Sequence, residues 1–144
     1  MKGETREENA SSNYFYARCV RSGHLSAPEF SQLENFIIKD SQYDLLWTEP
    51  TAEDVTWQDA LAYCTNLEFA GETGWRLPNI NELVTLIDHS TARPASQFPG
   101  MSLSYFWSST SYEGYAYNAW AVNTSDGTIK TMDKTYTAIP LCVK

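Results

Sequence analysis

Few side chains in this 144-residue chain could act as a nucleophile or a general base. A run of hydroxyl groups, Ser108–Thr110, follows Trp107, and the only histidines are His24 and His89. A nucleophilic serine needs a nearby base, and in many hydrolases it lies in a Gly-x-Ser-x-Gly turn, which this sequence lacks. We therefore interpret these hydroxyl groups as structural and expect no catalytic residue and no enzymatic activity.

The histidine and acidic side chains also lack the spacing of a metal site. Neither His24 nor His89 has a second ligand at zinc-site spacing. Asp40 and Asp44 do not have the spacing of an EF-hand calcium loop. We expect no metal ion and no other cofactor.

The three cysteines limit covalent cross-linking. They are Cys19, Cys64 and Cys142, and because the number is odd, at most one disulfide can form within the chain. No apolar signal core is present near the N-terminus, so either the protein is cytosolic or a leader has been removed. The residues alone leave the pairing and the compartment open.

A tyrosine-rich segment, residues 111–118, has the composition of a binding loop. Tyrosine, serine, glycine and asparagine are frequent in such loops, because tyrosine provides contact area at a small cost in conformational entropy. The alternative is that one or two of the tyrosines pack on a sheet. The residues that we predict to contact a ligand are Tyr112, Glu113, Tyr115, Tyr117 and Asn118.

Composition and charge limit the class of protein and its partners. Hydrophobic residues make up 42% and charged residues 19%, which excludes a disordered chain. No apolar run approaches the roughly 20 residues that cross a bilayer, so we expect no membrane span. The net charge of -8 disfavours nucleic acids, because their binding normally requires a basic surface.

Two segments have the pattern of amphipathic helices. The first follows Thr56, a good N-cap, and its apolar residues recur at helical spacing over residues 57–67. The second follows Asn79, with Glu82 at the third helical position, which is the arrangement of a capping box. We expect the second helix to end near His89.

Segments that alternate apolar and polar residues indicate strands on both sides of these helices. Asp126-Gly127 is a strong hairpin-turn signal. The order of strands, two helices and then antiparallel strands predicts an α+β fold. The expected strands are residues 14–21, 36–38, 45–47, 104–108, 118–124, 128–132 and 135–143, with a turn at 40–44.

The first 34 residues are set apart from the rest. Residues 1–13 are polar and are interpreted as a flexible tail or a cloning remnant. Residues 14–34 contain a strand and a connector, and the segment 15–21 resembles residues 138–144 because both end in Cys-Val and a basic residue. Residues 14–34 could therefore be the end of a preceding repeat, and residues 35–144 form the main domain.

The tryptophans and one arginine are assigned structural roles. Most tryptophans within regular elements belong to the core. Arg76 could be a ligand-binding base, but a structural cation paired with a carboxylate or with backbone carbonyls is favoured. The residues assigned in this way are Trp75, Arg76, Trp107 and Trp120.

Five short motifs follow one another in the order of a known family. They are Thr56–Cys64 (TWQDALAYC), Gly74–Leu83 (GWRLPNINEL), Tyr105–Thr110 (YFWSST), Ala119–Val122 (AWAV) and Leu141–Lys144 (LCVK). The series resembles the Lcl C-terminal domain family, which is found at the end of bacterial collagen-like adhesins and in many secreted proteins. The resemblance extends from about Phe36 to Lys144.

The resemblance implies a C-type-lectin-like fold, with two helices packed on twisted antiparallel sheets. It also implies a disulfide between Cys64 on the first helix and Cys142 on the last strand, with Cys19 left over. The calcium-binding triplets of sugar-binding C-type lectins are absent. Formylglycine-generating enzymes, which have a related fold, need a reactive cysteine pair, whereas Cys64 and Cys142 look structural.

We therefore predict a non-catalytic binding or adhesion module that is secreted, at the cell surface or periplasmic. It would recognise a glycan or a protein surface through the loop at residues 111–118, and it could form a homo-oligomer. The family's adhesin binds sulfated glycans through basic surfaces, but a chain of charge -8 would repel them, so that ligand is not carried over. The alternatives are a structural spacer in a multi-domain surface protein and an enzyme of the formylglycine-generating type.

Overall fold

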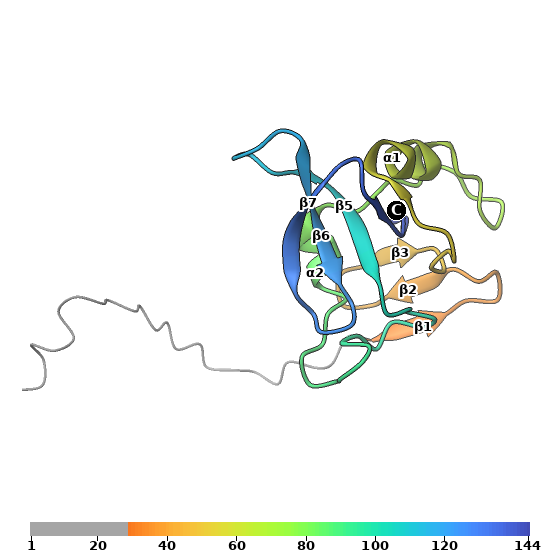
Figure 1. Ribbon diagram of the computed structural model, residues 1–144. Coiled ribbons are helices and arrows are strands. Elements are labelled where there is room, and N and C mark those ends of the chain that lie inside the picture. The colour runs from red at the N-terminus through yellow and green to blue at the C-terminus, as the bar shows by residue number, and fades with distance from the viewer. Residues whose placement is uncertain (1–28) are drawn as a thin grey trace, which may run out of the picture.

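The computed structural model describes residues 29–144, and the segments predicted at 1–13 and 14–21, with Cys19 and His24, lie outside these residues. The described part consists of short strands and two short helices (Figure 1). The elements are β1 (Phe30–Gln32), β2 (Ile38–Asp40), β3 (Leu45–Trp47), β4 (Val55–Thr56), α1 (Trp57–Asn66), α2 (Ile80–Val84), β5 (Tyr105–Ser111), β6 (Asn118–Asn123), β7 (Ile129–Asp133) and β8 (Thr137–Ala138).

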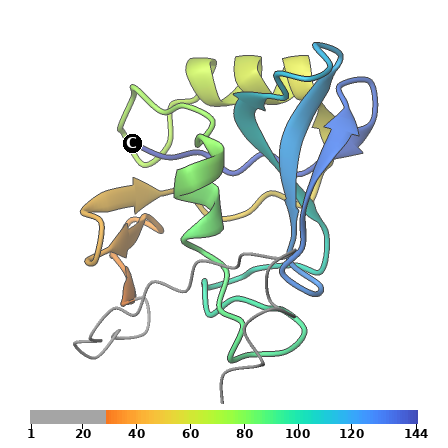
Figure 2. The ribbon, with the colours of Figure 1, turned by 90° about the vertical axis from the view of Figure 1, so that its left-hand side faces the viewer.

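The strands form three antiparallel sheets. β1, β2 and β3 make the first sheet, β4 and β8 the second, and β5, β6 and β7 the third. In the third sheet Trp107 lies opposite Ala121, and Trp120 lies opposite Thr131. Figure 2 shows the first and third sheets on opposite sides of α2, with α1 above them. The α+β class predicted from the sequence is therefore confirmed.

The first sheet differs from the prediction. β1 forms at Phe30–Gln32, within the expected polar connector, because its backbone pairs with β2 although its side chains show no apolar pattern. Phe36 was expected in a strand, but it has a φ of 67° and an exposed side chain, and β2 begins only at Ile38. Asp40 was expected in the turn, but it ends β2, and its Oδ1 accepts a hydrogen bond from the N–H of Gln42.

α1 begins where the sequence predicted. The side chain of Thr56 accepts a hydrogen bond from the N–H of Asp59 and so acts as the N-cap. The helix ends at Asn66, several residues before Gly71, which was expected to end it. Its buried residues, Ala60 and Cys64, face the interior, as the helical spacing predicted.

α2 has the predicted capping box but is shorter than expected. The Asn79 side chain accepts a hydrogen bond from the N–H of Glu82, and the Glu82 carboxylate accepts one from the N–H of Asn79. The hydroxyl of Thr85 donates to the carbonyl of Glu82, which competes with helical hydrogen bonding, and the chain then continues in tighter turns. The predicted extension to His89 is therefore wrong. Among residues 29–144, no helix is long and apolar enough to cross a membrane.

The C-terminal segment connects sheets and is not one strand at 135–143. Only Thr137–Ala138 forms a regular strand, β8. Ile139 then makes an isolated bridge to β5, and Val143 bridges to β3 and to the segment before α2. Pro140 lies between these contacts and has no N–H group to continue a ladder. The segment thus ties the third sheet to the first.

The interior contains two clusters of buried side chains. The first surrounds a disulfide between Cys64 and Cys142, whose Cα atoms are 5.4 Å apart and whose side chains are fully buried. The second includes Trp47 of β3 and Phe106 of β5. The disulfide ties α1 to the C-terminal segment, so the pairing that the resemblance implied is confirmed.

Candidate binding surface

The predicted binding loop joins β5 to β6 at one end of the third sheet. The N–H of Tyr112 donates to the carbonyl of Asn118 (2.9 Å), and the N–H of Asn118 donates to the carbonyl of Tyr115 (2.9 Å). These bonds close the loop on itself. The loop projects beyond the body of the molecule (Figure 1).

The ring of Tyr112 supports the loop from inside. It packs edge-to-face on Trp120, with ring centroids 5.5 Å apart, and its side chain is 38% exposed. A Cβ atom added to Gly114 would lie 2.7 Å from the Tyr112 ring, so a larger residue there would displace the ring. Tyr112 therefore packs on the sheet, which is the alternative that the sequence analysis left open for one or two tyrosines.

Tyr115 and Tyr117 present their rings to solvent. They are 55% and 69% exposed, and their ring centroids are 5.4 Å apart in an edge-to-face arrangement. Glu113 is also exposed, whereas Asn118 is half-buried at the start of β6. Large apolar groups that gather at one exposed place mark interaction surfaces, whereas scattered ones do not.

Lys134, in the connection after β7, anchors this loop. Its Nζ donates to Oγ of Ser111 and to the carbonyl of Ala116, both at 2.8 Å. The same ammonium group lies 4.1 Å from the ring centroid of Trp57, which is a cation–π contact. The backbone N–H of Lys134 donates to the carbonyl of Tyr117 (2.9 Å). One residue therefore holds the loop at three points along its length.

Tyr136 is a further exposed ring near this loop that was not predicted from the sequence. It was expected within a strand, but it lies in the connection after β7 and is 64% exposed. The polar run Asp133–Thr135 has the composition of a turn and was the signal available for placing it. We call the two loops, residues 111–118 and 133–137, the tip. Figures 1 and 2 show both loops at the same end of the third sheet, near α1.

Hydrogen bonds keep one carboxylate of the tip ionised. Oδ1 of Asp133 accepts hydrogen bonds from the N–H (2.9 Å) and the hydroxyl (2.7 Å) of Thr135. Both bonds hold the pKa of Asp133 below its ordinary value. Asp133 therefore contributes a negative charge to the tip at neutral pH.

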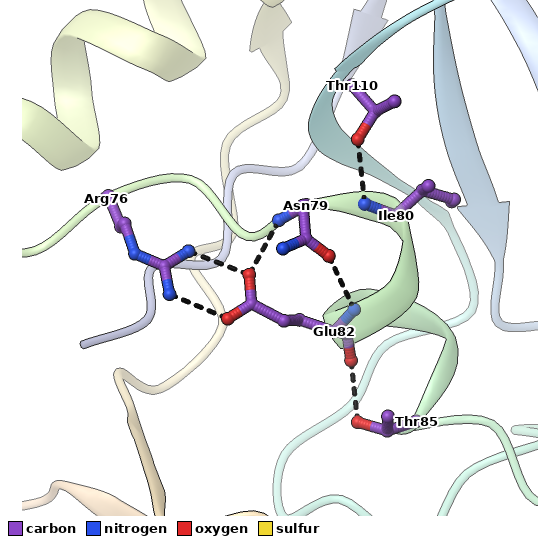
Figure 3. A network of polar contacts seen from close by, with 6 residues as sticks. All are labelled: Arg76, Asn79, Ile80, Glu82, Thr85 and Thr110. Carbon is purple, nitrogen blue, oxygen red and sulfur yellow. Dashed lines mark hydrogen bonds and ion pairs between the residues drawn. The ribbon is translucent and has the colours of Figure 1, made fainter.

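Arg76 belongs to a second polar cluster, at the start of α2 (Figure 3). Its Nη1 and Nη2 each lie 2.7 Å from a carboxylate oxygen of Glu82, which also accepts the N–H of Asn79. The hydrogen bonds from Arg76 hold the pKa of Glu82 below its ordinary value, although partial burial opposes this, and the Asn79 bond adds to the lowering. The same pairing raises the pKa of Arg76. The N–H of Ile80 donates to the hydroxyl of Thr110 (3.0 Å), which links this cluster to β5.

Two of the three tryptophans assigned to the core, Trp75 and Trp107, belong to it, whereas Trp120 lies outside both core clusters. Trp75 and Trp107 are buried, and the indole N–H of Trp107 donates to the carbonyl of Val55 (2.8 Å). Trp120 is half-buried beneath Tyr112. A buried indole ring with a satisfied N–H is typical of a structural tryptophan.

The motifs that build these contacts match a family model. The model of the Lcl C-terminal domain matches residues 36–144, which include the tip, the Arg76–Glu82 pair and the disulfide. The chain belongs to the Lcl C-terminal domain family. The family resemblance identified in the sequence is therefore confirmed. A comparison with curated proteins gives no match.

Several reactive groups of this Lcl C-terminal domain are occupied in structural contacts. The hydroxyl of the buried Ser108 donates to the carbonyl of Trp120 (2.6 Å), and Cys64 and Cys142 are joined to each other. His89 is exposed at the wall of a pocket of about 300 Å³. In the part of the chain that the structure describes, no group of three or more His, Cys, Asp or Glu residues is placed to hold a metal ion.

Proposed function

We propose that this Lcl C-terminal domain is a non-catalytic binding module that works outside the cytoplasm. It recognises a glycan or a protein surface through residues 111–118. The observation that carries the proposal is the exposure of Tyr115 and Tyr117 on a loop that Lys134 and Tyr112 hold in place. A loop that is fixed before binding loses little conformational entropy when a ligand docks.

The family and the disulfide support the proposed location. Membership of the Lcl C-terminal domain family favours an adhesin-related role at a surface. A disulfide is compatible with an oxidising, extracellular compartment, because cytosolic thiols are normally kept reduced. The C-type-lectin-like fold belongs to the same proposal. Two short helices, antiparallel sheets and a disulfide from the first helix to the last segment are consistent with it.

The state of the reactive groups supports binding over catalysis. A formylglycine-generating mechanism needs a reactive cysteine pair, whereas Cys64 and Cys142 are bonded to each other and fully buried. The Ser108 hydroxyl donates its hydrogen bond to the backbone carbonyl of Trp120. The tip presents rings and hydrogen-bonding groups, which serve recognition.

The test compares the unaltered chain with a Tyr115→Ser, Tyr117→Ser double variant, on a glycan array and in pull-downs from envelope extract. We expect the double variant to bind its ligand at least about tenfold more weakly, because exposed aromatic anchors dominate binding energy. Tyr43→Ser is the matched control, since Tyr43 is 49% exposed but lies in the turn between β2 and β3. A ligand that binds the double variant as well as the unaltered chain contradicts the proposal, and so does the absence of any ligand in both assays.

A further inference from the structure

We infer that the ligand of the tip is an uncharged glycan, held on the exposed rings of Tyr115, Tyr117 and Tyr136. Lys134 is then a positioning residue that holds the loop and makes no contact with the ligand. This inference rests on the proposed function. It adds to that proposal the chemical class of the ligand and a third aromatic ring, that of Tyr136, which lies outside the predicted loop.

Two of the three N–H donors of Lys134 are used within the loop. An ammonium group has three N–H donors. Ser111 and Ala116 accept two hydrogen bonds from it, and the ring of Trp57 covers it at 4.1 Å. An anion would therefore find at most one of the three donors unused, and that donor belongs to a group that lies against an aromatic ring.

The rest of the tip and its surroundings are acidic. The segments that meet there, residues 54–59, 111–118 and 133–137, contain four acidic residues and one basic residue, which is Lys134. Lys130 lies 4.3 Å from the ring centroid of Tyr105, toward the other end of the third sheet. Like charges repel at an interface, so this surface disfavours sulfated, sialylated or uronic-acid glycans.

The exposed rings suit the faces of uncharged sugars. A pyranose ring has apolar C–H faces that pack on an aromatic side chain, and its hydroxyl groups lie at the edge. The exposed Glu113 lies in the same loop and can accept hydrogen bonds from such hydroxyl groups. Tyr117 and Tyr136 come from two loops that the hydrogen bond from the backbone N–H of Lys134 to the carbonyl of Tyr117 joins, and both residues are exposed.

A basic peptide is the competing ligand for this surface. Glu113 and the net negative charge of the tip would attract it, so its binding would weaken as the salt concentration rises, whereas that of an uncharged glycan would not. An uncharged glycan needs only ring faces and hydrogen-bonding groups, and the tip exposes both.

The test uses the whole chain on a glycan array that carries neutral, sulfated and sialylated glycans side by side. The array is read at about 0.05 M and about 0.5 M sodium chloride, which changes the screening length severalfold. We expect binding to neutral glycans that changes less than about twofold between the two salt concentrations, because no ion pair contributes. Tyr117→Ala and Tyr136→Ala should each weaken it about tenfold. Ile129→Ala, at an exposed residue outside the tip, should leave it unchanged.

Two substitutions of Lys134 separate positioning from direct contact. Lys134→Met keeps an unbranched side chain but removes all donors, so binding to the same neutral glycans should fall about tenfold while amide exchange in residues 111–118 speeds up. Lys134→Arg retains the charge and the donors and should restore most of the affinity. If Lys134→Met abolishes binding without faster exchange in the loop, Lys134 contacts the ligand and the positioning role is wrong.

The outcomes distinguish this inference from the proposed function. Binding confined to sulfated or sialylated glycans, or a protein ligand at the tip without any glycan signal, overturns the inference and leaves the proposed function in place. If binding to neutral glycans is unchanged in Tyr136→Ala, the loop at residues 133–137 is not part of the binding site. The absence of any ligand in the array and the pull-down overturns both.

Discussion

Arg76 and Lys134 each hold a loop in place, but they do so with different partners. Arg76 forms two hydrogen bonds to the carboxylate of Glu82, whereas Lys134 bonds to a hydroxyl, a carbonyl and an aromatic ring. The first arrangement neutralises one charge with another and completes the cap of a helix. The second supports a loop whose rings stay exposed. A basic residue can therefore neutralise a carboxylate in a structural cluster or hold a loop whose rings stay exposed, and the chemistry of its acceptors decides which.

The disulfide connects these two regions. Cys64 lies on α1, whose first residue, Trp57, contacts Lys134. Cys142 precedes Val143, whose N–H and carbonyl pair with the backbone of Arg76 at 2.8 and 3.0 Å. Breaking the disulfide should therefore affect both regions, whereas single substitutions should affect one.

Removing the disulfide should have the largest effect. The bond closes a loop with a sequence separation of 78 residues, for which the chain-entropy model gives a stabilisation of about 4 kcal/mol. We expect Cys64→Ala with Cys142→Ala to lower the free energy of unfolding by about this amount. Chemical denaturation in a Cys19→Ser background measures it without thiol exchange. Unchanged stability would show that packing alone joins the two regions.

Glu82→Ala should have the next largest effect. It removes the N3 member of the capping box and leaves Arg76 without its carboxylate. We expect a loss of about 2 kcal/mol in the free energy of unfolding, discounted because the Arg76 side chain is half exposed. Glu82→Gln keeps a capping box and should lose only about 1 kcal/mol. Equal losses in the two variants would mean that the cap contributes nothing.

Lys134→Met should destabilise the protein less than Glu82→Ala does. It removes two hydrogen bonds and one cation–π contact at the surface, so we expect a loss of about 1 kcal/mol. Lys130→Met is a control that removes one such contact, over Tyr105, and should lose about 0.5 kcal/mol. Thermal unfolding of both variants measures the difference. A larger loss at Lys130 would contradict the anchoring role of Lys134.

The sequence predicted the elements that local chemistry fixes. The N-caps at Thr56 and Asn79 and the α+β order depend on short-range patterns, and the structure has them. The predictions for the segments that form β1 and the C-terminal segment were wrong, because the conformation of both segments depends on distant partners. The backbone of β1 is ordered by β2, and Val143 pairs with residues far from it in the sequence.

The tip was predicted only in part for the same reason. Composition identified the loop at residues 111–118. Only the structure shows that the connection after β7, which contains the exposed Tyr136, lies beside this loop. The role of Lys134 depends on acceptors 18 and 23 residues away and on Trp57. No local pattern in the sequence encodes such contacts.

The smallest expected effect is a difference in pH dependence between the two regions. The pKa of Glu82 is lowered in the folded state by Arg76, so the stabilisation that it gives is fully present above the unfolded value of about 4.3 and is lost as the pH falls through the folded value. We expect unfolding free energies measured from about pH 6 down to about pH 3 to fall less steeply in Glu82→Gln than in the unaltered chain.

The lowered pKa values of Asp88, Asp126 and Asp133 act in the same pH range, but they are common to both proteins and cancel in the comparison. Lys134→Met should keep the slope of the unaltered chain, because Lys134 contacts a hydroxyl, a carbonyl and an aromatic ring, and none of these is a carboxylate. If Glu82→Gln and the unaltered chain lose stability in parallel, the Arg76–Glu82 pair is no more sensitive to acid than the anchor at Lys134, and the contrast between the two regions fails.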